Sequence, residues 1–266
     1  MADAEPMPPM VARTGDLGRR VVVGVALAVV ALAALSAGGV ALWMLATIVA
    51  LIALVEWGGL VGADRLRLAL AIIILAVAMT HAMPALWGTD RATVALLLIA
   101  SLLFALVPGC APVAWGVACV GLAGIGLMFL RDQPHGLALA IWTLVVVWAT
   151  DIGAYFAGRR FGGAKLAPRI SPNKTWAGLI GGMAAAAIVG ALAAAAGGLP
   201  VSALWLGAPL AVVAQAGDLF ESRMKRRAGV KDSGRLLPGH GGVLDRVDGV
   251  LPVVILIAAL NANGTF

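Results

Sequence analysis

The sequence predicts an all-α, polytopic integral membrane protein: a helical bundle with about nine transmembrane helices and a cytoplasmic N-terminus. Hydrophobic residues make up 62% of the chain and charged residues only 12%, and the mean hydropathy is +1.01. Several uncharged stretches are longer than the roughly 18 residues that a membrane-crossing helix needs. The sequence lacks the apolar/polar alternation of membrane β-barrel strands. Together these observations exclude a soluble enzyme that merely follows a signal peptide.

Breaks inside the uncharged stretches determine the predicted number of spans. The uncharged stretches are 21–55, 68–89, 92–130, 133–150, 175–217 and 249–266. Three of these are too long for one helix, and each has turn-forming residues near its middle, at 36–39, 108–112 and 197–200. Dividing the stretches there predicts two, one, two, one, two and one spans in chain order. The first two spans are short unless they extend into 18–20 and 56–60.

The distribution of basic residues predicts the orientation. With nine spans and a cytoplasmic N-terminus, 17 of the 19 Lys and Arg residues fall on the cytoplasmic side, and only Arg91 and Arg131 fall outside. The positive-inside rule describes such a bias. On the simplest interpretation, the basic loops only set the topology and contact anionic lipids. The acidic residues interleaved with them argue for a further role.

Small residues are abundant in the predicted spans. The chain has 34 glycines, including Gly181 and Gly182, and alanine runs at 184–187 and 193–196. Small residues let the backbones of transmembrane helices approach one another closely. We therefore interpret these positions as packing surfaces.

Acidic residues near the C-terminus form the first candidate site. Residues 215–249 hold five of the 13 acidic and seven of the 19 basic residues. Asp245 and Asp248 are three positions apart, so on a helix their carboxylates project from one face and can share a cation. Asp218 lies where the eighth predicted span ends. Carboxylates are ligands that Mg²⁺ prefers, and Mg²⁺ completes its shell with water and phosphate. Alternatively, these acids only pair with a neighbouring arginine or lysine in a solvated patch.

Glycines and basic residues beside these acids indicate phosphate binding. The turn Gly239–Gly242 comes just before a predicted helix, where unpaired backbone N–H groups and the helix dipole attract phosphate oxygens. Lys225, Arg226, Lys231 and Arg246 add positive charges for the same anions. The turn alone is a weak signal. Acids for a metal, glycines for phosphates and cations for a polyphosphate form a combination that few other purposes need.

A second candidate region precedes the seventh predicted span. Asp151 ends a span that has no other charge, and an acid at a membrane edge is a functional candidate. Its alternative role is a structural ion pair with Arg159 or Arg160. Ser171 and Lys174 lie just before a helix N-terminus, where they can hold a phosphate or a nucleotide edge.

These residues resemble the phosphatidate cytidylyltransferase (CDP-diacylglycerol synthase) family. The resemblance covers Ser222, Met224–Arg226, Lys231-Asp232, Gly234, Leu237-Pro238, His240–Val243 and Asp245–Asp248. Residues 151–175 also look like the family's bacterial members, whereas residues 1–130 resemble it only in hydropathy and number of spans. The resemblance implies an enzyme that converts CTP and phosphatidic acid to CDP-diacylglycerol and pyrophosphate with Mg²⁺, and with K⁺ as a second cation.

The chemistry of two anionic reactants suggests a role for each candidate. We assign the metal to Asp218, Asp245 and Asp248, with Asp232 as an orienting acid. The residues expected to hold phosphates or substrate are Lys225, Arg226, Lys231, Arg246, His240, Gly241 and Gly242, and those expected to contact the nucleotide are Ser171, Lys174 and Ser222, with Asp151 nearby. Residues 1–130 then form about five N-terminal spans, and 131–266 a catalytic membrane domain with cytoplasmic loops at 158–174 and 218–248.

The substrates imply the location and the partners. CTP is cytoplasmic and phosphatidic acid lies in the membrane, so we expect a site at the cytoplasmic edge of a bacterial inner membrane. The family tendency is a homodimer, and no nucleic acid partner is expected. Two alternatives remain: a transporter or ion pathway, which would place charges at mid-depth, and a related lipid enzyme such as a CTP-using polyprenol kinase or an archaeal ether-lipid synthase.

Overall fold

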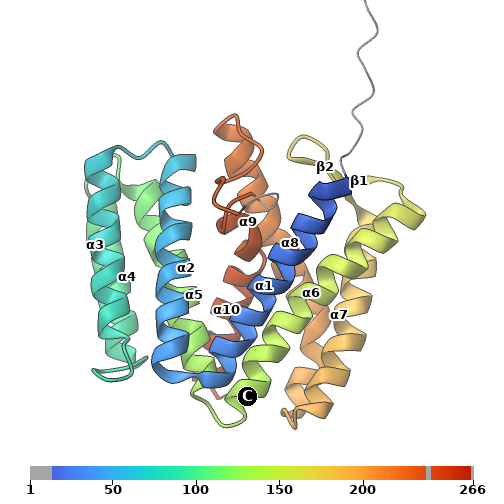
Figure 1. Cartoon of the computed structure of the whole chain (residues 1–266), viewed down its shortest axis with the longest axis horizontal. Coiled ribbons are helices and arrows are strands. Elements are labelled where there is room, and N and C mark those ends of the chain that lie inside the picture. The colour runs from blue at the N-terminus through green and yellow to red at the C-terminus, as the bar shows by residue number, and fades with distance from the viewer. Residues whose placement is uncertain (1–13, 238–240, 265–266) are drawn as a thin grey trace, which may run out of the picture.

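The protein is a bundle of helices, seen in a computed structural model that describes residues 14–237 and 241–264 (Figure 1). Within these ranges the helices are α1 (Thr14–Ala37), α2 (Gly39–Leu60), α3 (Arg65–His81), α4 (Arg91–Ala105), α5 (Ala111–Arg131), α6 (Gly136–Phe161), α7 (Trp176–Ala196), α8 (Val201–Arg227), α9 (Leu244–Val247) and α10 (Val250–Ala262). Two short strands, β1 (Lys165–Ala167) and β2 (Ser171–Thr175), form an antiparallel hairpin between α6 and α7.

The helices have the length and composition of a membrane protein. Among the described residues, α2, α5, α6, α7 and α8 are long and apolar enough to cross a bilayer, and α4, α10 and the apolar part of α1 are shorter apolar helices. The prediction of a helical membrane protein is therefore confirmed. The count of nine spans and the cytoplasmic N-terminus stay predictions.

The three predicted breaks are confirmed as helix boundaries. Gly38 separates α1 from α2, Gly109 lies between α4 and α5, and Gly198 lies between α7 and α8. Each has a positive φ, of 64°, 79° and 64° respectively. Glycine adopts this conformation without the clash that a Cβ would cause, which explains why the helices stop at these positions.

Two helices extend into the segments expected as cytoplasmic loops, at 158–174 and 218–248. α8 continues to Arg227, so residues 218–227 are helical and the connection to α9 starts only at 228. α6 similarly continues to Phe161, beyond the start of the loop expected at 158. Loss of hydropathy marks where a helix leaves an apolar environment, but Lys, Arg and Glu favour helix as strongly as most apolar residues do. The helices therefore extend past the uncharged stretches.

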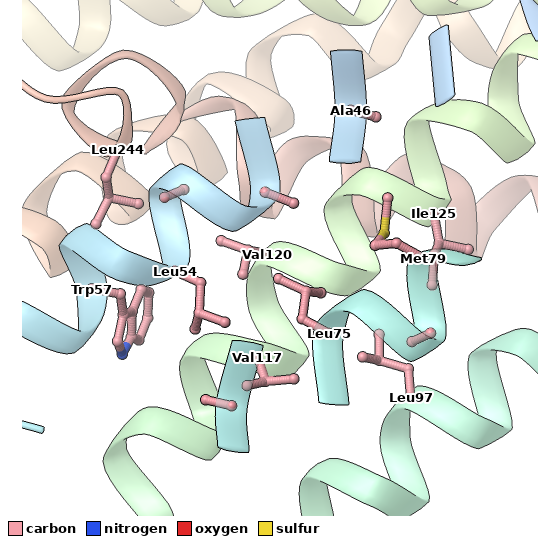
Figure 2. Close-up of a cluster of buried hydrophobic side chains, with 14 of the residues drawn as sticks. Ala46, Leu54, Trp57, Leu75, Met79, Leu97, Val117, Val120, Ile125 and Leu244 are labelled. Carbon is pink, nitrogen blue, oxygen red and sulfur yellow. The ribbon is translucent and has the colours of Figure 1, made fainter. Parts of the chain in front are cut away.

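The first apolar core lies between α2, α3, α4 and α5 (Figure 2). Leu54, Leu75 and Val117 are fully buried in it. The same core includes Met224 of α8 and Leu244 of α9. Residues before and after position 130 thus share one core, and the division into domains at that position stays a prediction.

A second core joins α6, α7, α8 and α10 around Trp142. The indole of Trp142 donates a hydrogen bond of 2.8 Å to the carbonyl oxygen of Gly190. α6 and α7 approach so closely that a Cβ on Gly153 would lie 2.7 Å from the carbonyl oxygen of Gly181 and 2.5 Å from the Cβ of Ala185. This contact agrees with the interpretation of the small residues as packing surfaces.

Arg131, at the end of α5, binds the C-terminal end of α1. Its Nε donates to the carbonyl oxygen of Leu35 at 2.6 Å, and its Nη2 donates to that of Ser36 at 3.1 Å. The last carbonyls of a helix have no partner within the helix. The guanidinium supplies that partner.

The candidate regions gather at one end of the bundle. Because successive helices run in alternating directions, the ends of α2, α6 and α8 lie together with the β hairpin and α9, at the top of Figure 1. The C-terminal end of α10 and the contact of Arg131 with α1 lie at the opposite end. Segments that are far apart in the sequence therefore meet at the upper end.

Candidate functional site

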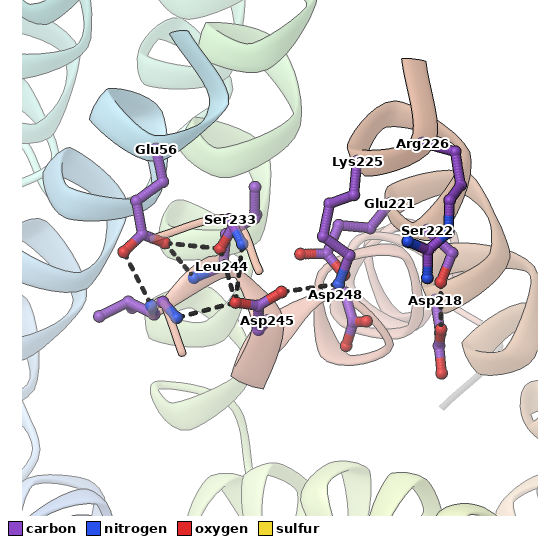
Figure 3. A network of polar contacts seen from close by, with 12 residues as sticks. Glu56, Asp218, Glu221, Ser222, Lys225, Arg226, Ser233, Leu244, Asp245 and Asp248 are labelled. Atoms are coloured by element: carbon purple, nitrogen blue, oxygen red, sulfur yellow. Dashed lines mark hydrogen bonds and ion pairs between the residues drawn. The ribbon is translucent and has the colours of Figure 1, made fainter. Parts of the chain in front are cut away.

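Lys225 on α8 bridges two carboxylates. Its ammonium lies 2.8 Å from Oε2 of Glu221 on the same helix and 2.6 Å from Oδ1 of Asp245 on α9 (Figure 3). The three side chains are 13%, 4% and 6% exposed. In this group two buried carboxyl groups share a single ammonium. It also fastens α9 to α8.

The other oxygen of Asp245 organises the chain before α9. Oδ2 accepts hydrogen bonds from the backbone N–H of Ser233 at 2.9 Å, from the hydroxyl of Ser233 at 3.0 Å and from the N–H of Gly242 at 2.8 Å. Burial opposes ionisation of Asp245, but the hydrogen bonds from Lys225 and from these backbone groups outweigh it and lower its pKa to about 2. Asp245 is therefore ionised at neutral pH.

Glu56 belongs to the same network, although it was not among the site residues predicted from the sequence. Its Oε1 accepts the N–H of Val243 at 3.0 Å, and its Oε2 accepts the N–H of Leu244 at 2.7 Å and lies 3.1 Å from the hydroxyl of Ser233. Glu56 lies on α2, far from the charged segment in sequence. The one available signal was a single acid at the end of a long apolar stretch.

Lys174 connects the β hairpin to α8. Its ammonium lies 2.7 Å from Oδ2 of Asp218 and donates to Oε1 of Gln215 at 2.8 Å. The other oxygen of Asp218 accepts the hydroxyl of Ser222 at 3.2 Å. The two candidate regions of the sequence are thus brought together through Lys174 and Asp218.

Arg226 adds a second connection to the hairpin. Its Nε donates to the carbonyl oxygen of Ile170 at 3.3 Å. Ser171, next in the chain, pairs with Ala167 across the hairpin and is partly exposed. The hairpin is therefore placed over the last turns of α8.

Asp248, Glu221, Asp218 and Asp151 bring several negative charges together. Burial raises the pKa of Asp248, and the negative charge of Asp218 raises it further. Asp248 also lies against Glu221 and within electrostatic range of Asp151. The Oε1 atom of Glu221 is buried and accepts no hydrogen bond from the described residues. An unpartnered buried carboxylate oxygen is unfavourable, so the cluster lacks positive charge or protons.

This donor set is chemically suited to a cation but is not arranged as a finished metal centre. Across residues 14–237 and 241–264, no three His, Cys, Asp or Glu side chains converge closely enough to hold a metal ion. Asp218 is paired with Lys174, and both oxygens of Asp245 are engaged. Oxygen donors and an uncompensated negative charge nevertheless fit a hard divalent cation. Among these residues, Glu221 contacts Lys225 through Oε2 alone, and Oδ1 of Asp248 accepts the backbone N–H of Gly249.

An apolar cavity reaches these acids. It has a volume of about 340 Å³ and lies between α2, α5, α8 and α10. Trp57 and Phe220 line it with their rings 5.8 Å apart, and its polar lining consists of Glu221 and Asp248. The cavity can therefore take a molecule with an apolar body and a polar end.

The remaining predicted residues lie around the network. Lys231, Asp232 and Arg246 are exposed, and Asp232 lies close to Gly241, which has a φ of 82°. His240 falls outside the described residues. The N–H of Gly242, which the sequence suggested for phosphate, donates to Asp245 in this structure.

The chain is similar to proteins of known family. Residues 18–262 match the model of the family described as the cytidylyltransferase family. Among curated proteins, the chain is similar to the phosphatidate cytidylyltransferases of Brucella suis (53% identical over 156 residues, 56% of each chain), Pseudomonas aeruginosa (47% over 139 residues, 51% of each chain) and Bacillus subtilis (44% over 135 residues, 48% of this chain and 50% of the relative). The matched region is about half the length of these relatives. Because the family match covers nearly the whole sequence, the chain belongs to the cytidylyltransferase family.

Proposed function

We propose that the protein is an integral membrane phosphatidate cytidylyltransferase, which converts CTP and phosphatidic acid to CDP-diacylglycerol and pyrophosphate. The observation that carries the proposal is the apolar cavity that ends at Glu221 and Asp248, beside a group of basic residues. The part of a diacylglycerol nearest its phosphate would occupy this cavity, with the rest of its acyl chains in the lipid and its phosphate at the charged end. Family membership supports the same reaction.

The proposed reaction joins two anions. An oxygen of the phosphatidate phosphate attacks the α-phosphorus of CTP, a new P–O bond forms, and the bond to the β-phosphate breaks to release pyrophosphate. No general base is needed, because the phosphatidate oxygen is already ionised. Repulsion between the reactants and charge growth on the leaving group dominate the barrier, so positioned positive charge is the main catalytic requirement.

The acids near the cavity are proposed to hold the metal. We assign Mg²⁺ to Asp218, Asp245 and Asp248, with K⁺ as a second cation. Glu221 joins this set because its buried Oε1 has no donor among the described residues. Bound there, Mg²⁺ would neutralise phosphate oxygens during the transfer. Asp245 would enter only by exchanging one of its present contacts with Lys225, Ser233 or Gly242.

The basic residues are proposed to bind the phosphates. Lys225, Arg226, Lys231 and Arg246 lie on α8, α9 and the segment between them, at the end of the bundle where the cavity's acids lie. Lys174, Ser171 and Ser222 are proposed to contact the nucleotide, with Asp151 and Asp232 as orienting acids. Lys174 would then divide its interactions between Asp218 and the triphosphate.

The proposed reaction sets the orientation in the membrane. CTP is a cytoplasmic solute, so the end of the bundle that carries the β hairpin and α9 faces the cytoplasm of a bacterial inner membrane. Phosphatidic acid enters sideways from the lipid. A homodimer is the proposed assembly. Single cysteines introduced into residues 165–175 of a protein without Cys110 and Cys119 should react with an impermeant thiol reagent from the cytoplasmic side, and labelling from the outside alone would contradict this orientation.

Transfer of label from CTP tests the activity. Purified protein in detergent micelles containing phosphatidic acid and Mg²⁺ is supplied with CTP labelled at the α- or the γ-phosphate. We expect the α-label in extractable lipid and the γ-label in pyrophosphate, and no transfer in EDTA. A γ-label in lipid would indicate a kinase, and no lipid label of either kind would refute the proposal. Comparing diacyl with ether-linked lipid phosphate separates a synthase of the archaeal type.

A further inference from the structure

Glu56 is a buried charge in an otherwise uncharged helix. It lies near the C-terminal end of α2 and is 8% exposed. Burying a carboxylate is strongly unfavourable unless hydrogen bonds compensate for the lost water. Its hydrogen-bond partners lie 177 to 188 residues later in the chain, in the segment that leads into α9. A buried acid satisfied wholly by a distant segment indicates a role in that segment's conformation.

We propose that Glu56 is a positioning residue for the reaction: it holds Ser233 and the start of α9 in the conformation that places Asp245 and Asp248 against α8. This inference rests on the proposed cytidylyltransferase activity and names a determinant of it in the N-terminal part of the chain. Glu56 does not touch the reacting atoms. Both of its oxygens accept hydrogen bonds from the protein, which leaves no free oxygen for acid–base work.

Two paths lead from Glu56 to the candidate catalytic acids. The first is the backbone, because the N–H groups of Val243 and Leu244 that bind Glu56 begin α9, which contains Asp245 and precedes Asp248. The second is the hydroxyl of Ser233, which lies 3.1 Å from Oε2 of Glu56 and 3.0 Å from Oδ2 of Asp245. A hydroxyl has one proton, so it donates to one carboxylate at a time and couples the two.

Two glycines provide the space that the carboxylate occupies. A Cβ on Gly234 would clash with Oε1 of Glu56, and a Cβ on Gly242 would clash with Oε2. The end of a glutamate can usually move aside, but here two backbone hydrogen bonds hold it in place. The segment around Glu56 is therefore built to admit this carboxylate. Figure 3 shows Glu56 facing Ser233 and the start of α9, with Asp245 beyond them.

The main test compares Glu56→Gln with a matched control. Gln keeps the size of the side chain but replaces one acceptor oxygen by an amide NH₂, which cannot accept a backbone N–H. Asp64→Asn makes the same charge change eight positions later, at the exposed N-cap of α3, where Asn caps as well as Asp. Both proteins are assayed for CMP transfer and for hydrogen–deuterium exchange of residues 228–249.

The expected results separate positioning from binding and from general stability. For Glu56→Gln we expect kcat to fall about 10- to 100-fold, with the KM for CTP within about threefold of the unmodified protein, because misplaced groups lose rate more than affinity. Exchange at residues 228–249 should accelerate about tenfold or more, since one of the two backbone donors, the N–H of Val243 or that of Leu244, loses its partner. Asp64→Asn should stay within about twofold in each measurement, as surface changes usually do.

A second variant disturbs the position of the Glu56 carboxylate by a change in the segment that it contacts. Gly234→Ala leaves Glu56 intact but displaces its carboxylate, so it should lower kcat and accelerate exchange in the same segment. Gly234→Ala can also test the inference if the Glu56→Gln protein does not fold. Unchanged kcat and unchanged exchange in a folded variant of either kind would overturn the inference. If the unmodified protein transfers no CMP, the proposed function fails, and the exchange measurement alone then decides whether Glu56 holds this segment.

Discussion

Replacing Lys225 by methionine should lower the free energy of unfolding, because the buried carboxyl group of Glu221 loses its hydrogen-bond donor. Lys225 is the cation between Glu221 and Asp245, and methionine keeps most of the length of its apolar stem. Asp245 would retain its three donors from Ser233 and Gly242. Glu221 would retain none among the described residues, because its other oxygen already lacks one. The variant therefore leaves a buried carboxylate without compensation.

The expected loss follows from the burial of these groups. The side chain of Glu221 is 4% exposed and that of Lys225 is 13% exposed, so solvent screens their interaction little. Removing one partner of a buried ion pair costs about 3–5 kcal/mol. Because the side chain of Lys225 keeps some exposure, we expect a value near the lower limit, about 3 kcal/mol.

Unfolding in detergent, followed by tryptophan fluorescence, measures this loss. Adding Glu221→Gln to Lys225→Met restores the local charge and should recover most of the stability. Adding Asp245→Asn instead should recover less, since Asp245 keeps other donors. The reasoning is refuted if Lys225→Met is as stable as the unmodified protein, or if Asp245→Asn rescues it better than Glu221→Gln does.

Three further predictions concern a candidate metal ligand, a helix contact and a helix cap. Asp248→Asn should abolish Mg²⁺-dependent CMP transfer. Burial raises the pKa of Asp248 to about 6, so its ionised form destabilises the folded protein above that pH. In EDTA at pH 8 the variant should therefore unfold at the same temperature as the unmodified protein or at a higher one. Gly153→Val should destabilise the α6–α7 contact by at least about 3 kcal/mol in the same assay, because a side chain there would meet Gly181 and Ala185. Thr175→Val should cost about 1 kcal/mol and accelerate amide exchange in the first turn of α7, because the Thr175 hydroxyl accepts the N–H of Gly178 at 3.0 Å.

Hydropathy and turn residues predicted the helix boundaries inside the membrane well. Gly38, Gly109 and Gly198 stop helices because their backbone conformations exclude most other residues, and such positions are readable from sequence. The ends of α6 and α8 were predicted less well. Charged residues continue a helix without difficulty, so the point where a helix leaves the membrane and the point where it ends are different. The short β hairpin between α6 and α7 has no alternation of apolar and polar residues that would indicate strands in the sequence.

The sequence indicated many of the residues in the candidate site but not which of them contact one another. The sequence placed Asp218 and Lys225 in one charged region and Lys174 in a second, and the structure joins Asp218 to Lys174 directly. It gave no indication that Glu56 lies beside this region, because that contact depends on how α2 packs against α9. It also suggested a free backbone N–H at Gly242, which the structure assigns to Asp245. Pairings between distant segments depend on tertiary packing, which no local pattern records.

The attachment of Arg131 to the end of α1 bears on how membrane topology is counted. Arg131 is one of the two basic residues that fall on the outer side in the predicted orientation. Under the positive-inside rule, a basic residue on that side counts slightly against the orientation. The guanidinium of Arg131 instead serves the carbonyl oxygens of Leu35 and Ser36. An Arg131→Leu change should therefore loosen the junction of α1 and α2, because the last carbonyl groups of α1 lose their hydrogen-bond donor.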